Sequence, residues 1–105
     1  MAQFAVCRNK NPQTRSAIPF LLDVQNDLLD DLETRVVVPL CPLSAMKSRP
    51  LRTLTPVLEI EGESFVMLTP QMAGIPRSEL GAPVTRLDHY RFEIIAAFDF
   101  LLTGF

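Results

Sequence analysis

"PVLEIEGESFVMLT", residues 56–69, contains two apolar runs joined by Glu61, Gly62 and Glu63. Aliphatic, β-branched and aromatic residues at alternating positions favour a half-buried strand. Glycine supplies the positive φ that a tight turn between two strands requires. The stretch therefore predicts an antiparallel β-hairpin, and it makes a mainly β protein the starting expectation.

The segments on either side of the hairpin also favour strands. Gln3–Cys7 (QFAVC) places Phe4 and Val6 on one side, with the period of a strand that has one buried face. The β-branched run in Arg35–Leu40 (RVVVPL) gives the clearest single-strand signal. After the hairpin, residues 71–84 are interrupted by two glycines and two prolines, so we expect only short edge strands there.

The last segment changes to a helical period. We expect a helix from His89 to Leu102, with Asp88 capping its first turn and Gly104 following as a stop residue. Apolar residues recur on one face of this helix at spacings of three and four. The face expected to pack on the sheet comprises Leu87, Tyr90, Ile94, Ala97, Phe98 and Leu101.

The second half of this helix is apolar nearly all round. Ile95, Ala96 and Leu102 point away from the expected sheet-facing side, and a helix that is apolar on every side is normally buried on every side. A small domain has too little bulk to cover both faces, so we expect a second copy or another protein to cover the outer one. The alternative is that the tail tucks into the parent core, although the open carboxylate of Phe105 argues against deep burial.

Length and composition restrict the class of protein. The 105 residues fit a single domain, 1–105, and 48% hydrophobic residues are enough for a core. A formal charge of −2 argues against binding nucleic acid mainly through phosphates. The first ten residues lack the pattern of a signal peptide and no apolar run is long enough to span a membrane, so we expect a cytoplasmic protein.

The residue types that carry chemistry form no recognisable catalytic or metal motif. Cys7 and Cys41 are expected to be free, buried thiols, and His89 has no nucleophile tied to it by a motif. We therefore expect no catalytic residue, no metal and no cofactor. One acidic stretch lacks the spacing of a calcium loop and is interpreted as a solvated loop; it contains Asp23, Asp27, Asp30, Asp31 and Glu33.

Four segments together resemble the CcdB toxins, in the same order along nearly the whole chain. They are Asp23–Asp30 (DVQNDLLD), Thr34–Leu40 (TRVVVPL), Leu58–Pro76 (LEIEGESFVMLTPQMAGIP) and the apolar helix that ends in Gly104 and Phe105. The resemblance implies an antiparallel sheet related to the SH3-like barrel, with a C-terminal α-helix. It also implies a symmetric homodimer.

The same resemblance implies a function without enzymatic activity. CcdB toxins belong to type II toxin–antitoxin systems: they bind the A subunit of DNA gyrase, trap it with its DNA cleaved, and are neutralised by a CcdA-like antitoxin. The best-known member has tryptophan at the position of Thr103 and asparagine at that of Asp99. The implied gyrase contacts form a helix-end set, Asp99, Leu102, Thr103, Gly104 and Phe105, and a loop set, Asn26, Leu28 and Leu29.

Two basic loops are candidates for docking an acidic, disordered antitoxin segment, and ordinary solvated loops are the alternative. This basic set consists of Arg8, Lys10, Arg15, Lys47, Arg49 and Arg52. Two other functions remain open at this point. One is an endoribonuclease toxin of the same barrel fold, and the other is a relic that only dimerises and binds antitoxin.

Overall fold

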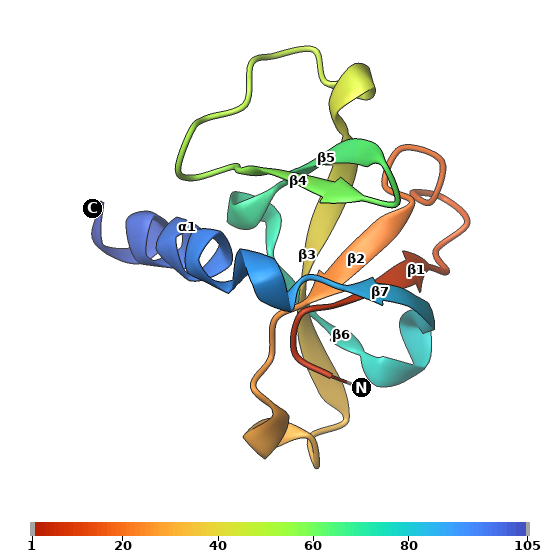
Figure 1. The fold of residues 1–105 in the computed structure, drawn as a ribbon. Helices are drawn as coiled ribbons and strands as arrows, with labels where there is room; N and C mark the ends of the chain where they lie inside the picture. The colour runs from red at the N-terminus through yellow and green to blue at the C-terminus, as the bar shows by residue number, and fades with distance from the viewer. Residues whose placement is uncertain (1, 105) are drawn as a thin grey trace.

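The computed structural model describes residues 2–104 and contains a seven-stranded antiparallel sheet followed by one α-helix (Figure 1). The strands are β1 (Ala5–Asn9), β2 (Phe20–Asp23), β3 (Thr34–Pro42), β4 (Val57–Ile60), β5 (Glu63–Met67), β6 (Ala73–Pro76) and β7 (Leu80–Arg86), and the helix is α1 (Arg91–Thr103). Short 3₁₀ turns are η1 (Asp27–Leu29), η2 (Leu43–Ala45), η3 (Thr69–Gln71), η4 (Arg77–Glu79) and η5 (Asp88–Tyr90). The expectation of a mainly β chain with a C-terminal helix is confirmed.

The β4–β5 hairpin forms as predicted. Ile60 pairs with Glu63 across a two-residue turn, and both turn residues have positive φ, 52° at Glu61 and 83° at Gly62. A turn of this type matches the right-handed twist of the strands that it joins. Leu58 and Ile60 point into the core, while Val57 and Glu59 face solvent.

Strand β3 is the spine of the sheet, whose order is β4-β5-β3-β2-β1-β7 with β6 also paired to β3. Its first half pairs with β6, through Val37 opposite Ala73, and its second half pairs with β5, from Leu40 opposite Met67. Pro39, which has no N–H to donate, lies at this change of partner. β2 pairs along the other edge of β3, so β3 pairs with three strands in all. The sheet curls into a half-barrel.

Two strands differ from the sequence-based expectation. β1 begins at Ala5 because Phe4 has φ 69°, outside the extended region, and donates its N–H to the Asp23 carbonyl at 2.6 Å. β7 is seven residues long, so the expectation of only short strands in residues 71–84 is wrong there. Bulges in its pairing with β1 accommodate the interruptions, and a Cβ at Gly81 would lie 2.8 Å from the Arg8 carbonyl oxygen.

The sheet buries a core on each face. The larger core includes Phe4 and Val6, as their alternation predicted, and it also takes in Ile94 and Ala97 of α1. The smaller core, on the opposite face, contains Cys7 among its members. The helix therefore covers one face of the sheet only. Within residues 2–104, no helix combines the length and hydropathy needed to cross a bilayer.

The start of the helix was predicted incorrectly and its end correctly. Asp88 makes no capping hydrogen bond, because both of its carboxylate oxygens accept from Arg86, each at 2.8 Å. This hydrogen-bonded pairing lowers the pKa of Asp88. The 3₁₀ turn η5 therefore intervenes, and α1 starts at Arg91. Gly104 ends the helix with φ 80° and donates its N–H to the Phe100 carbonyl at 2.9 Å.

The interpretation of Asp23 as part of a solvated acidic loop is wrong. Asp23 and Arg35 are both fully buried and form a bidentate ion pair, with Arg35 Nε 2.9 Å from Asp23 Oδ2 and Nη2 3.1 Å from Oδ1. A charge buried in this way is tolerated only when it is paired and hydrogen-bonded. The pair joins the end of β2 to the start of β3.

Removing one member of this pair should destabilise the protein strongly. We expect Asp23→Leu to lower the free energy of unfolding in urea by about 3–5 kcal/mol, because the Arg35 charge loses its bidentate partner. The double variant Asp23→Leu with Arg35→Met should be less destabilised than the single variant. Asp31→Asn, at an exposed position, serves as the control. A single variant as stable as this control would contradict the role given to the pair.

The two free cysteines differ in burial, so the expectation of buried thiols is confirmed for Cys7 and wrong for the half-buried Cys41. Burial, with a smaller contribution from the Asp23 carboxylate, raises the pKa of the Cys7 thiol. The Cys41 side chain contacts the Pro42 carbonyl at 3.6 Å, at the end of β3.

Because the thiolate is the reactive species, we expect a disulfide reagent at pH 8 to modify Cys41 quickly in the native protein. Cys7 should react only after denaturant is added. Titration of native and unfolded protein, with Cys41→Ser to assign the fast phase, measures this difference. Rapid modification of the Cys41→Ser variant in its native state would show that Cys7 is accessible.

Candidate functional site

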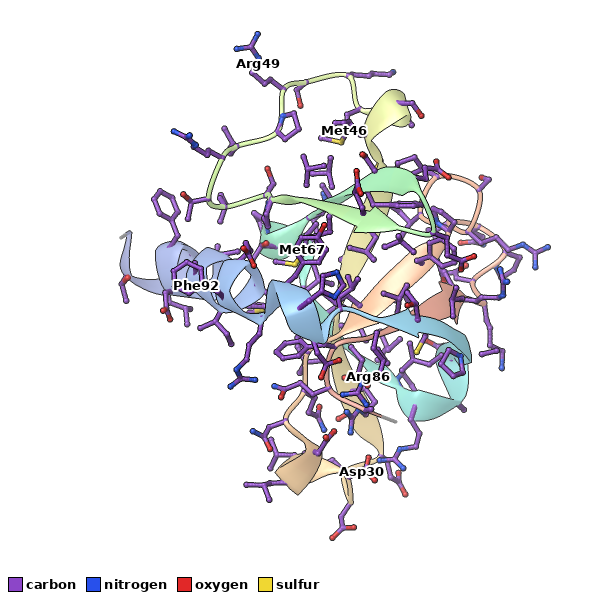
Figure 2. The ribbon with its side chains drawn as sticks, in the orientation of Figure 1. Asp30, Met46, Arg49, Met67, Arg86 and Phe92 are labelled. Carbon is purple, nitrogen blue, oxygen red and sulfur yellow. The ribbon has the colours of Figure 1, made fainter. Side chains whose placement is uncertain are left out.

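Within the described residues, one side of α1 carries large apolar side chains that are exposed. Phe92, Ile95, Asp99 and Leu102 follow one another at spacings of three and four, on the side away from the buried Ile94 and Ala97. The side chain of Phe92 is 81% exposed and that of Leu102 is 74% exposed. Figure 2 shows Phe92 standing out from the helix. We refer to these four residues as the exposed stripe.

The end of the helix presents backbone that a partner can approach closely. The Thr103 hydroxyl donates to the Asp99 carbonyl at 2.6 Å, so this polar group is already satisfied within the helix. A Cβ built at Gly104 would meet no atom within 4 Å. Phe105, which belongs to the predicted helix-end set, lies outside the described residues.

A hollow connects the helix to the segment that follows β2. Its volume is about 250 Å³, and Ile95 and Asp99 of the exposed stripe contribute to its wall. Val24, immediately after β2, and Phe4 line it as well. Phe4 carries the positive φ described above, and the Arg91 guanidinium lies 5.5 Å from the centre of its ring. We call this feature the helix hollow.

The loop of residues 24–33 contains the loop set and lies at the lower end of the sheet in Figure 1. Asn26 begins η1, and its side-chain oxygen accepts the Leu28 N–H at 2.8 Å. η1 contributes no buried residue: Leu28 is 91% exposed, and Leu29 is exposed as well. The expectation that this stretch exposes its leucines is confirmed.

The helix hollow is lined by one residue of the helix-end set and by none of the loop set. Asp99 lines it from the helix, and Val24 lines it two residues before Asn26. The expectation that Ile95 and Leu102 point away from the sheet is confirmed, because both side chains are exposed. Sequence reasoning missed Phe92, although its spacing to Ile95 and Asp99 was available. Phe4 gave no such signal, because its alternation with Val6 indicated only a core position.

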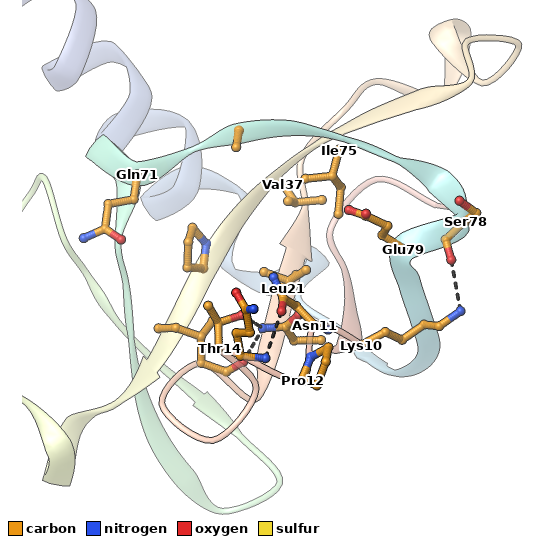
Figure 3. Close-up of a pocket in the computed structure, with 15 residues that line it drawn as sticks. Lys10, Asn11, Pro12, Thr14, Leu21, Val37, Gln71, Ile75, Ser78 and Glu79 are labelled. Carbon is orange, nitrogen blue, oxygen red and sulfur yellow. Dashed lines mark hydrogen bonds between the residues drawn. The ribbon is translucent and has the colours of Figure 1, made fainter.

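The first basic loop surrounds a second hollow. Arg8, Lys10 and Arg15 are all exposed and line a volume of about 560 Å³ together with Leu80 and Gly81. Lys10 Nζ donates to the Ser78 carbonyl at 3.0 Å and so reaches the η4 turn (Figure 3). None of the residues that line this hollow is a carboxylate or a histidine.

The second basic loop, residues 43–56, contains the other members of the basic set, Lys47, Arg49 and Arg52, all exposed. Phe20 pairs with Leu40, so both basic loops leave the same end of the β2–β3 pair. The loop of residues 24–33 leaves the opposite end, and Figure 2 shows Arg49 and Asp30 at opposite extremes of the molecule. Neither of the two hollows beside the first basic loop is lined by Lys47, Arg49 or Arg52.

A further hollow, of about 690 Å³, lies between the first basic loop and β6 (Figure 3). Leu21, Val37 and Ile75 give it an apolar floor, and Lys10 and Glu79 bring one charge of each sign to its lining. Such a surface suits an apolar side chain of a partner better than a charged ligand.

Asp30 and His89 are the remaining candidates for a chemical role. Asp30 accepts a hydrogen bond from Arg35 Nη1 at 2.9 Å and its side chain is 48% exposed, so the solvated-loop interpretation holds only in part for Asp30. His89 is exposed and packs on the Tyr90 ring with centroids 4.4 Å apart. Among residues 2–104, no three His, Cys, Asp or Glu side chains are grouped to hold a metal ion.

Comparison with known protein families finds a match over nearly the whole chain. The model of the family described as CcdB protein matches residues 3–104, which include the whole sheet, the loop of residues 24–33 and α1. CcdB proteins are toxins of toxin–antitoxin modules that target DNA gyrase. Because the match covers nearly the entire chain, this protein belongs to the CcdB family.

Proposed function

We propose that this protein is the toxin of a type II toxin–antitoxin system, and that it binds the A subunit of DNA gyrase and traps the enzyme with its DNA cleaved. The observation that carries the proposal is the set of exposed large apolar side chains on α1 and on η1, with Phe92 and Leu102 on the helix and Leu28 and Leu29 on the loop. Exposed apolar patches of this kind mark interaction sites in soluble proteins. Membership of the CcdB family supports gyrase as the target.

The active form in this proposal is a symmetric homodimer. The C-terminal end of α1 projects beyond the sheet in Figure 1, and Leu102 in its last turn is 74% exposed. A two-fold axis near the end of α1 would bring the two helix-end sets side by side. Together they would form one bipartite wedge that enters between two gyrase A subunits.

The proposed mechanism is binding alone, with no covalent step. Leu28 and Leu102 act as apolar contacts, because removing their exposed side chains from water on binding is favourable. Gly104 allows the partner backbone to approach closely, since nothing occupies the space around its Cα. The exposed Asp99 carboxylate requires a hydrogen-bond donor on gyrase, because burying it unpaired would be costly.

The antitoxin partner fits the other end of the sheet. An acidic, disordered segment of a CcdA-like antitoxin would dock on the basic set, where six positive side chains attract it and no helix-end or loop residue is involved. On one protomer, the basic set and the loop set would then lie at opposite ends of the β2–β3 pair. The family resemblance implies that the bound antitoxin segment competes with gyrase. Both partners act in the cytoplasm, where we place this protein.

A substitution at Gly104 tests the helix-end contact. Gly104→Glu should leave the fold and the dimer unchanged, because its side chain enters open space and the φ strain falls on the last turn only. Linear DNA should no longer accumulate when gyrase is incubated with this variant. Gly74→Glu is the matched control, since a Cβ there also meets no atom within 4 Å, and it should poison gyrase like the unaltered protein. Poisoning by Gly104→Glu would refute the contact.

Deletion of Thr103 to Phe105 separates the candidate functions. Linear DNA produced by the full chain and not by the shortened one supports gyrase poisoning through the helix end. Absence of linear DNA with both proteins refutes the proposal. Cleavage of messenger RNA by the purified chain would then identify a ribonuclease toxin, whereas dimerisation and antitoxin binding without either activity would identify a relic.

A further inference from the structure

The loop of residues 24–33 has a defined conformation without an apolar core of its own. η1 buries no residue, and Leu28, Leu29 and Leu32 are all exposed. Such a segment would normally sample many conformations, because little apolar burial offsets the entropy of ordering it. Polar contacts from outside the loop must therefore fix its shape.

Arg35 holds the base of the loop from β3. Besides its ion pair with Asp23, its Nη1 donates to Asp30 Oδ1 at 2.9 Å and its Nη2 donates to the Gln25 carbonyl at 3.3 Å. The Gln25 amide reinforces this base, because its Nε2 donates to the Leu29 carbonyl at 3.0 Å. These groups are at or near the core, so they are also required for folding.

Arg77 holds the outer part of the loop from a distant segment of the chain. It comes from η4, after β6, and its Nη2 donates to the carbonyls of Asp30 and Leu32, the latter at 2.8 Å. Its backbone N–H donates to the Glu33 carbonyl at 2.9 Å. The same Nη2 lies 3.5 Å from Asp30 Oδ1. The Arg77 side chain thus contacts three groups in the second half of the loop: two backbone carbonyls and the Asp30 carboxylate.

We propose that Arg77 is a positioning residue for the gyrase contact, holding the loop of residues 24–33 in the conformation that presents Leu28 and Leu29. The proposal rests on the function proposed above for this loop. Arg77 contacts backbone carbonyls and a carboxylate rather than either leucine, so its effect on binding is indirect. A loop that is already ordered before the encounter loses less conformational entropy on binding.

Because Arg77 lies at the surface, its effect on the order of the loop can be measured without unfolding the protein. Its side chain is 40% exposed, whereas that of Arg35 is fully buried. Replacing Arg77 removes hydrogen bonds at the surface and leaves the Asp23–Arg35 pair and both cores intact. The residue therefore acts on the order of one loop rather than on the stability of the sheet.

The test compares Arg77→Met, which keeps an unbranched chain and removes every donor, with Arg77→Lys, which keeps a charge and donors. Amide hydrogen exchange is measured at Leu29, Asp30 and Leu32, whose N–H groups bond within the loop. Affinity for the gyrase A subunit is measured by calorimetry. We expect Arg77→Met to accelerate exchange and weaken binding, each by about tenfold, with partial recovery in Arg77→Lys. The melting temperature should change little.

Arg86→Met is the matched control. Arg86 is similarly exposed, at 53%, and its carboxylate partner is Asp88 in its own segment. Its Nη2 also donates to the Gln3 carbonyl at 3.3 Å, so it reaches the loop only through Gln3, whose N–H donates to Asp27, and not at Leu29, Asp30 or Leu32. Loop exchange and affinity should both stay at their original values in this variant. Unchanged exchange in Arg77→Met would overturn the proposal, and so would faster exchange with full affinity. If the unaltered protein fails to bind gyrase, the proposed function fails, and the exchange data still show separately whether Arg77 orders the loop.

Discussion

The buried ion pair between Asp23 and Arg35 is the interaction on which the rest of the structure depends. It lies where β2 ends and β3 begins, so it fixes the register of the central strand pair and the base of the loop between them. Two fully buried charges are stable only in one geometry, because any other arrangement leaves one of them unpaired. The pair therefore favours a single arrangement at the point where β2 ends and the loop of residues 24–33 begins.

The second constraint is size. The sheet has two faces and the chain has one α-helix to cover them, within the described residues. The smaller core lies on one face of the sheet, and α1 covers the other face with only part of its apolar surface. The surplus apolar side chains on α1 and on η1 have no place inside a domain of this size. In a protein that acts by binding, the residues left over from folding become the residues available for recognition.

Much of the fold follows from local sequence rules, and most failures have a long-range cause. The hairpin at Glu61 and Gly62 and the helix stop at Gly104 were predictable because each depends on a few adjacent residues. The burial of Asp23 was not, because its partner is twelve residues away on another strand. Asp88 failed as a cap because Arg86 competes for its carboxylate. The helix-end and loop sets came from family resemblance, whereas Arg77 and the helix hollow became visible only once distant segments were placed together.

The antiparallel pairing of β2 with β3 places the loop of residues 24–33 at one end of these strands and both basic loops at the other. Under the proposed function, this polarity lets evolution treat the two recognition tasks separately. Substitutions that adapt the basic loops to a diverging antitoxin leave the loop of residues 24–33 unchanged. Substitutions in that loop likewise leave the basic loops unchanged. A lineage carrying several such toxins can then diversify its antitoxin specificities, and avoid cross-neutralisation, while all copies keep the same target.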